Sequence, residues 1–235
     1  MSVAFGLDQL RKKFIRGFVL TLPPDLTGSR PARQDGRRLR SERTRQAIID
    51  AYLELLRRSP LMPTAQQIAD EAGYSVRSVF ERFSDLNALT LATADYAIVQ
   101  GQAEAVARDV DADRPDRIQS HVATRAAACE KWLPLWKVLT ATQEQVEGLR
   151  TRVTMARHGN IARMRMMYAP ELSVLEEPAR EALLIALASL ISFESWDQMC
   201  NCFSLSPEQA RDVWRAAIDR MLPPTPVAAA VSTAA

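Results

Sequence analysis

The stretch from Thr64 to Phe83 reads TAQQIADEAGYSVRSVFERF and decides what fold to expect. Thr64 followed by Gln67 forms a capping box, in which the threonine oxygen accepts from an orphan backbone N–H and the glutamine reaches back to the cap. A short helix is therefore expected to begin there. Ala72-Gly73 is expected to end it, because glycine adopts the left-handed conformation without a Cβ penalty.

A second short helix is expected to start at the cap residue Ser75. Its apolar residues follow the i, i+3, i+4, i+7 spacing of one inward stripe, and the residues between them are polar or basic. The inward stripe is Val76, Val79, Phe80 and Phe83, and the outward residues are Arg77, Ser78, Glu81 and Arg82. Two short helices joined by a tight glycine turn, with a basic outer face on the second, are typical of a helix-turn-helix.

The flanking sequence completes a three-helix head. Apolar residues recur at helical spacing from Ser41 to Arg58, which predicts a preceding helix. A cap at Ser84 predicts a following helix that runs to about Arg108. Small helical bundles that bind no DNA also contain capped helices and glycine turns, so the stretch alone leaves that alternative open.

These residues resemble the tetracycline-repressor (TetR) family of bacterial transcription regulators. The resemblance covers about Arg43 to Thr93 and lies in a threonine-started helix, an alanine-glycine-apolar turn and a second helix that ends aromatic-x-basic-Phe. The matching positions are Thr64, Ile68, Ala69, Ala72, Gly73, Tyr74, Ser75, Phe80, Arg82, Phe83, Ala88 and Leu89. Two positions depart from the pattern: Phe80 stands where a phosphate-binding tyrosine is common, and Leu86 stands where a lysine is common.

The resemblance implies an all-α homodimer that binds a palindromic double-stranded DNA operator and is released from it by a small-molecule effector. It implies a cytoplasmic repressor that is not an enzyme, with no cofactor and no catalytic or metal-binding residues. A constitutive architectural or activating DNA-binding protein without an effector is the alternative. The residues expected to contact DNA are Thr64, Ser75, Val76, Arg77, Ser78, Phe80 and Arg82, joined by Arg37, Arg38, Arg40 and Arg43 ahead of the head.

The charge distribution supports a polyanion partner at one end of the chain. Residues 1–60 hold 13 basic against 6 acidic side chains, whereas the remaining residues hold 17 against 22. Residues 1–40 are expected to be a disordered basic arm that neutralises phosphates or enters the minor groove. Because 26 of the 30 basic residues are arginine, a composition bias is the competing explanation. Three cysteines without metal-ligand spacing suggest a reducing cytoplasm.

The body, residues 94–222, is predicted to be a helical effector-binding and dimerisation domain. Asp116 is expected to cap its first helix, and Pro134 is expected to interrupt it. Flexible methionines and flat aromatic rings adapt to apolar ligands, so a largely apolar effector is expected. The candidate lining residues are Trp132, Trp136, Met155, Met164, Met167, Phe193 and Trp196, all of which ordinary core packing would also explain.

The apolar run from Ala182 to Phe193 is too short to cross a membrane. Twelve helical residues extend about 18 Å, whereas a bilayer core is about 30 Å thick, so the run is expected to be a helix buried on both sides. A second capping box at Ser206 predicts the last helix. The resemblance implies that these two helices form a four-helix dimer interface through Leu183, Leu187, Leu190, Ile191, Trp214 and Ile218.

The domain boundaries that follow are residues 1–40 for the arm, 41–93 for the helix-turn-helix domain, 94–222 for the body and 223–235 for a disordered tail. Catalysis is disfavoured because His121 and His158 are far apart in the sequence and no nucleophile elbow or phosphate loop is present. Cys200 and Cys202 would point to different faces of a helix. The body is larger than dimerisation alone requires, which favours ligand sensing over the architectural alternative.

Overall fold

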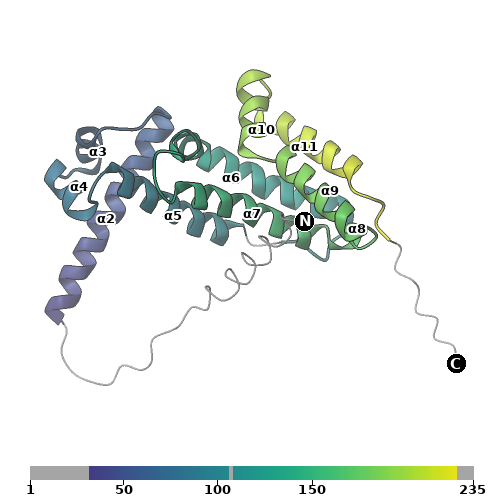
Figure 1. Ribbon diagram of the computed structural model, residues 1–235, viewed down its shortest axis with the longest axis horizontal. Helices are drawn as coiled ribbons and strands as arrows, with labels where there is room; N and C mark the ends of the chain where they lie inside the picture. The colour runs from purple at the N-terminus through teal and green to yellow at the C-terminus, as the bar shows by residue number, and fades with distance from the viewer. Residues whose placement is uncertain (1–31, 106–107, 227–235) are drawn as a thin grey trace. The chain divides into compact units, whose positions relative to one another are not determined.

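The computed structural model describes residues 32–105 and 108–226, and every regular element within those ranges is helical (Figure 1). The expectation of an all-α fold is confirmed. The chain divides into two compact units, residues 1–40 and 41–235. Residues 1–31 of the expected arm and 227–235 of the expected tail lie outside the described residues.

The first described helix, α2 (Ala32–Arg58), starts well before the expected Ser41. Residues 32–40 are therefore helical, and the prediction of disorder up to residue 40 is wrong for them. No proline occurs between Ala32 and Arg58, and Gly36 costs a helix only about 1 kcal/mol relative to alanine. Farther along α2, Ile48, Tyr52 and Leu56 are fully buried.

The two short helices of the head form as their capping residues predict. In α3 (Ala65–Ala72) Thr64 Oγ1 accepts from Gln67 N at 3.3 Å, and Gln67 Oε1 accepts from Thr64 N at 2.8 Å. Gly73 ends the helix with φ +71°, in the left-handed region. Ser75 Oγ then accepts from Ser78 N at 3.1 Å and starts α4 (Val76–Arg82). α3 and α4 pack against each other.

Helix α5 (Leu86–Glu104) joins the head to the body. Its cap is Asp85 rather than the expected Ser84, because the Asp85 carboxylate accepts from Ala88 N at 2.7 Å while Asp85 itself is extended. The helix ends at Glu104, short of the expected Arg108. The buried Tyr52 hydroxyl and Thr90 Oγ1 share a hydrogen bond of 3.0 Å that ties α2 to α5.

Helix α6 (Arg114–Thr142) is the longest element of the body. Its cap is Asp113, not Asp116, which instead donates its backbone N–H to the Asp113 carboxylate at 3.2 Å. Pro134 lies inside α6 and does not end it, so the predicted interruption is wrong. The adjoining Trp132, Leu135 and Trp136 are all buried, and this packing outweighs the cost of a proline inside a helix.

The remaining helices of the body are α7 (Leu149–Met167), α8 (Ala169–Leu172), α9 (Glu177–Leu190), α10 (Phe193–Asp197) and α11 (Pro207–Met221), with a π-helical turn, η1 (Gln198–Cys202), after α10. Helix α6 contacts α5, α7, α10 and α11, whereas α8 contacts α7, and α9 contacts α7 and α11. No helix among the described residues is long and apolar enough to span a membrane.

The apolar run from residue 182 to 193 is not one helix buried on both sides. α9 ends at Leu190, and Ser192 caps the separate helix α10 by accepting from Ser195 N at 3.0 Å. One side of α9 faces the core through Leu184 and Leu187. The other side is exposed and carries Ala182, Ile185, Ala186 and Ser189.

Replacing Gly73 or Gly159 by alanine is expected to change stability in opposite directions. A Cβ at either position meets nothing within 4 Å, but only Gly73 has a positive φ. Gly73→Ala is expected to lower the free energy of unfolding by about 1 kcal/mol, because alanine is strained in the left-handed region. Gly159→Ala, inside α7, is expected to raise it by about 1 kcal/mol. Urea unfolding monitored by circular dichroism measures both; equal effects of the two changes would contradict the assignment of the turn.

Candidate functional site

The outer face of α4 carries the side chains that the sequence predicts will contact DNA. The Arg77 side chain is 88% exposed and Phe80 is 45% exposed, so both can reach a partner. Val76 and Ser78 are half-buried. Phe80 therefore does not belong to the inward stripe, where the sequence placed it; Val79 and Phe83 do.

Arg77 and Glu81 form an ion pair one helical turn apart. Arg77 Nε donates to Glu81 Oε1 at 3.0 Å. Because both side chains are well exposed, this pair contributes only about 0.5 kcal/mol. A competing phosphate or base edge can therefore draw Arg77 away from Glu81 at little cost.

Arg82 and Arg45 help to hold the head together. Arg82 is half-buried, and its Nε has no hydrogen-bond partner among the described residues. Its carbonyl accepts from Arg45 Nη1 at 3.2 Å, and the Arg45 guanidinium lies 4.3 Å from the centre of the Phe83 ring. Arg45 thus fastens α2 to the end of α4, a role that the sequence gave no reason to assign.

The arginines ahead of the head are displayed on a helix rather than on a loose arm. Arg37, Arg38, Arg40 and Arg43 are all exposed on α2. Arg40 Nε donates to the Gly36 carbonyl at 3.1 Å within the helix. Tyr74, in the turn before α4, is 40% exposed and adds a phenol that sequence reasoning did not select.

The predicted effector residues lie in the body core, with one exception. Trp132, Trp136, Met164, Met167, Phe193 and Trp196 are buried, whereas Met155 is 38% exposed. The centres of the Trp136 and Phe193 rings lie 4.6 Å apart in a stacked pair, and Arg125 covers the other face of Phe193 at 4.4 Å. These side chains mostly fill space against one another.

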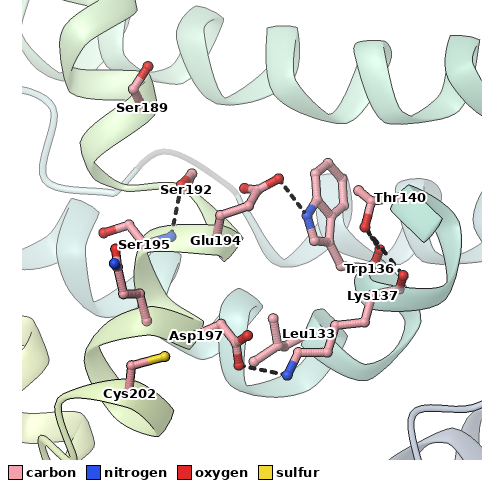
Figure 2. A pocket seen from close by; sticks show the side chains of 11 residues that line it. Leu133, Trp136, Lys137, Thr140, Ser189, Ser192, Glu194, Ser195, Asp197 and Cys202 are labelled. Carbon is pink, nitrogen blue, oxygen red and sulfur yellow. Dashed lines mark hydrogen bonds and ion pairs between the residues drawn. The ribbon is translucent and has the colours of Figure 1, made fainter.

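A cavity of about 610 Å³ opens beside this stack, between α6, α9, α10 and η1 (Figure 2). Of the predicted effector residues only Trp136 lines it. The other lining residues are mostly polar: Leu133, Lys137, Thr140, Ser189, Ser192, Glu194, Ser195, Asp197, Gln198 and Cys202. A search of the sequence for apolar, methionine-rich patterns does not find such a site. π-helical turns are frequent at functional sites. The turn η1 next to the cavity therefore indicates a candidate site, and this indication is visible only in the structure.

Four of the six predicted dimer residues are buried within the single chain. Leu187, Ile191, Trp214 and Ile218 are at most 1% exposed, and Leu183 and Leu190 are half-buried. Side chains enclosed by their own chain cannot form a surface for a second copy, so the selection of these four is wrong. Helical spacing identified the apolar side of each helix, and that side packs inward.

A buried polar cluster links α6 to α7 and α8. Arg117 makes a two-pronged ion pair with Glu171, at 2.8 Å and 2.6 Å, and their side chains are 3% and 0% exposed. The Tyr168 hydroxyl and His121 Nδ1 share a hydrogen bond of 2.7 Å. Burial, helped by the charges of Arg163 and Arg125, lowers the pKa of His121 to about 3. His121 is therefore neutral at physiological pH.

The pKa of Glu171 reflects two opposed effects. Burial pushes it upward, but hydrogen bonds from Arg117 and Thr225 outweigh burial and hold it below its ordinary value of 4.5. Within the described ranges no group of three or more histidine, cysteine or acidic side chains is placed to hold a metal ion.

Two solved structures share this architecture across most of the chain. One is a protein from Rhodococcus sp. provisionally assigned to the TetR family of transcriptional regulators, with a TM-score of 0.60 and 19% identity, covering 76% of this chain and 98% of that one. The other is a provisionally identified transcriptional regulator from Pseudomonas aeruginosa PAO1, with a TM-score of 0.57 and 19% identity, covering 77% and 90%. No family model and no curated protein matches the sequence. The similarity confirms the TetR-like fold.

The buried ion pair predicts a large and pH-dependent contribution to stability. Arg117→Met is expected to lower the free energy of unfolding by about 3–5 kcal/mol, because it leaves Glu171 buried and unpaired. The control Arg57→Met removes an exposed pair with Glu54 and should cost much less, because water screens exposed ion pairs. Because the folded pKa of Glu171 is lowered, its contribution is complete above pH 4.5 and is lost as the pH falls through the folded pKa. Denaturant unfolding at neutral and acidic pH measures this, and similar losses in the two variants would refute it.

Proposed function

We propose that this protein is a DNA-binding transcriptional regulator of the TetR type: a cytoplasmic homodimeric repressor that a small molecule releases from a palindromic operator. The observation that carries the proposal is the helix-turn-helix of α3 and α4, with its capped, exposed and basic second helix. The TetR-like fold of the two solved structures supports it. The remaining parts of the proposal follow from the surfaces of the head and body.

The first turn of α4 is suited to reading bases in the major groove. Arg77 is almost fully exposed there, and a bidentate arginine is the commonest specific partner of guanine. Phe80 lies one turn farther along the exposed side and supplies an apolar contact of the kind that thymine methyl groups make. The exposed arginines of α2 supply phosphate contacts that add affinity without sequence information.

The role of Arg77 is tested on the DNA sites that the protein selects from random sequence. Arg77→Ala is expected to remove about 1–3 kcal/mol of discrimination at one base pair in each half-site, measured by fluorescence anisotropy on single-base variants of the selected site. Arg57→Ala, which breaks another exposed helical ion pair of the head, that with Glu54, is the control and should leave discrimination unchanged. Equal weakening on all site variants would reduce Arg77 to a surface ion pair. A selection that enriches no sequence would overturn the regulator itself.

Helices α9 and α11 contact each other, and each has an exposed side. A second copy of the chain is expected to cover these two exposed sides. On α9 this side carries Ala182, Ile185 and Ala186, and on α11 it carries Val213 and Ala216. Ile185 is 59% exposed and Val213 is 45% exposed. Small residues permit close helix approach, and the two apolar side chains supply burial. A two-fold pairing would place the heads on half-sites about 34–36 Å apart, or a small multiple of that distance.

Ile185→Asp tests this surface. It is expected to convert the dimer to a monomer and to abolish cooperative operator binding, because it places a charge in the centre of the buried contact. Light scattering coupled to size-exclusion chromatography gives the mass. The control Val174→Asp changes an equally exposed apolar residue, 52% exposed, that lies outside α9 and α11. A dimeric Ile185→Asp protein would move the interface elsewhere.

Helix α5 is the element through which the body would act on the head. At its start Leu89 is fully buried in the hydrophobic core, and farther along the Tyr96 ring meets Trp132 edge to face at 6.5 Å. Arg152 of α7 donates to Asp95 at 2.9 Å and 3.1 Å and ties the same part of α5 to the body. A ligand that shifts α6 or α7 would thus move α5, and allosteric coupling of about 1–3 kcal/mol corresponds to a 5- to 150-fold loss of operator affinity.

A further inference from the structure

The polar cavity between α6, α9, α10 and η1 has a lining that favours one class of ligand. Its volume of about 610 Å³ falls within the range of small-molecule sites, about 300–1,000 Å³. The body was expected to bind a largely apolar effector, yet carboxylates, hydroxyls and an amide make up most of these walls. The hydrogen-bonding capacity that these groups leave unused defines what would fit.

Two of the four hydroxyls that line the cavity, those of Thr140 and Ser189, present only lone pairs to a ligand. Thr140 Oγ1 donates its proton to the Trp136 carbonyl at 2.9 Å, and Ser189 Oγ donates to the Ile185 carbonyl at 2.9 Å. A hydroxyl whose proton is engaged can only accept from a ligand. These two positions therefore call for ligand groups that donate hydrogen bonds.

The two carboxylates of the cavity lie three residues apart on α10, and each uses one oxygen for its side-chain contacts. Glu194 Oε1 accepts from Trp136 Nε1 at 3.1 Å and from Arg157 at 2.9 Å. Asp197 Oδ1 accepts from Lys137 Nζ at 2.7 Å and also from Asn201. Glu194 Oε2 and Asp197 Oδ2 receive no side-chain hydrogen bond from the described residues. Each has lone pairs left for a donor on a ligand.

The lining itself carries more acidic than basic side chains. Lys137 is the single basic side chain among the lining residues, against the two carboxylates, and Arg157, which lies outside the lining, also pairs with Glu194. Burial raises the pKa of Glu194, but hydrogen bonds from its own backbone N–H, from Trp136 and from Arg157 outweigh burial and hold the pKa below its ordinary value, so Glu194 is ionised. Figure 2 shows the Lys137 ammonium against Asp197. An ammonium group thus already occupies part of this surface.

We propose that this cavity binds an organic amine through Glu194 Oε2, Asp197 Oδ2 and the lone pairs of Thr140 and Ser189. The cationic nitrogen bonds the carboxylates, in competition with Lys137, while the carbon part of the ligand lies against Leu133 and the edge of Trp136. This assignment names the chemical class of the effector and so rests on the proposed regulator. The binding itself is testable without DNA.

Three indole compounds that differ in one terminal group test the charge requirement: tryptamine is a cation, tryptophol is neutral and indole-3-acetate is an anion. Spermidine serves as a second, aliphatic cation. Isothermal titration calorimetry on the full chain is expected to show binding of tryptamine or spermidine, and at least about tenfold weaker binding of tryptophol and indole-3-acetate, the loss of one charge-assisted hydrogen bond. Failure of both amines to bind, or equal binding of tryptophol and tryptamine, overturns the proposal.

Variants of the lining give effects of opposite sign, which misfolding cannot imitate. Asp197→Asn and Glu194→Gln are each expected to weaken the bound amine at least about tenfold. Lys137→Met removes the internal competitor and should tighten binding about two- to fivefold. Glu144→Gln, which removes an exposed carboxylate paired with Arg150 outside the cavity, is the matched control and should change nothing. Unchanged affinity in Asp197→Asn and Glu194→Gln would place the amine elsewhere.

Measuring operator affinity with and without the amine distinguishes failure of the amine site from failure of the proposed regulator. An amine that binds as described and weakens operator affinity supports both. If the amine binds and operator affinity stays the same, the cation site stands and the release mechanism fails. If the protein selects an operator but binds neither amine, the regulator stands and the cation site fails.

Discussion

The burial of helix α6 along most of its length is the constraint on which the body depends. Its inward residues recur every three or four positions, from Ile118 through Val122, Ala126 and Cys129 to Trp132, Trp136 and Leu139, and none is more than 6% exposed. Burying this much apolar surface is the dominant favourable contribution to folding. It carries the helix through Pro134, and it fixes the positions of α5, α7, α10 and α11, all of which contact α6.

The apolar packing of α6 therefore fixes the positions of the polar side chains on the same helix. Arg117 is tolerated because Glu171 and backbone carbonyls satisfy its guanidinium, and His121 is kept neutral by burial. Near the other end, Trp136 must stack on Phe193 to be buried, which brings its indole N–H to Glu194. The polar cavity is thus a consequence of packing at the edge of the core. Its position beside α6, which also contacts α5, connects it to the element that leads to the head.

Local sequence signals predicted the short helices of the head and the start of α11 well, because capping and glycine turns are local. The capping boxes at Thr64 and Ser206 each involve residues three apart, and the Gly73 turn needs one backbone conformation, so each can be identified without tertiary information. The same reasoning failed where competing local signals existed. Asp85 rather than Ser84 caps α5, and Asp113 rather than Asp116 caps α6, because the cap is whichever of the neighbouring candidates the chain leaves extended.

By itself the sequence determined the all-α class, the helix-turn-helix and the exposed position of Arg77 on α4, since periodicity, capping and glycine turns act over a few residues. Only the tertiary structure decided which apolar residues face inward and which stay on the surface. Leu187 and Ile185 are both apolar residues of α9, yet one is fully buried and the other is 59% exposed. Likewise the acidic and serine residues around α10 become a cavity lining only when α6 packs against them. A side chain's exposure depends on neighbours distant in the sequence, and helical periodicity contains no information about those neighbours.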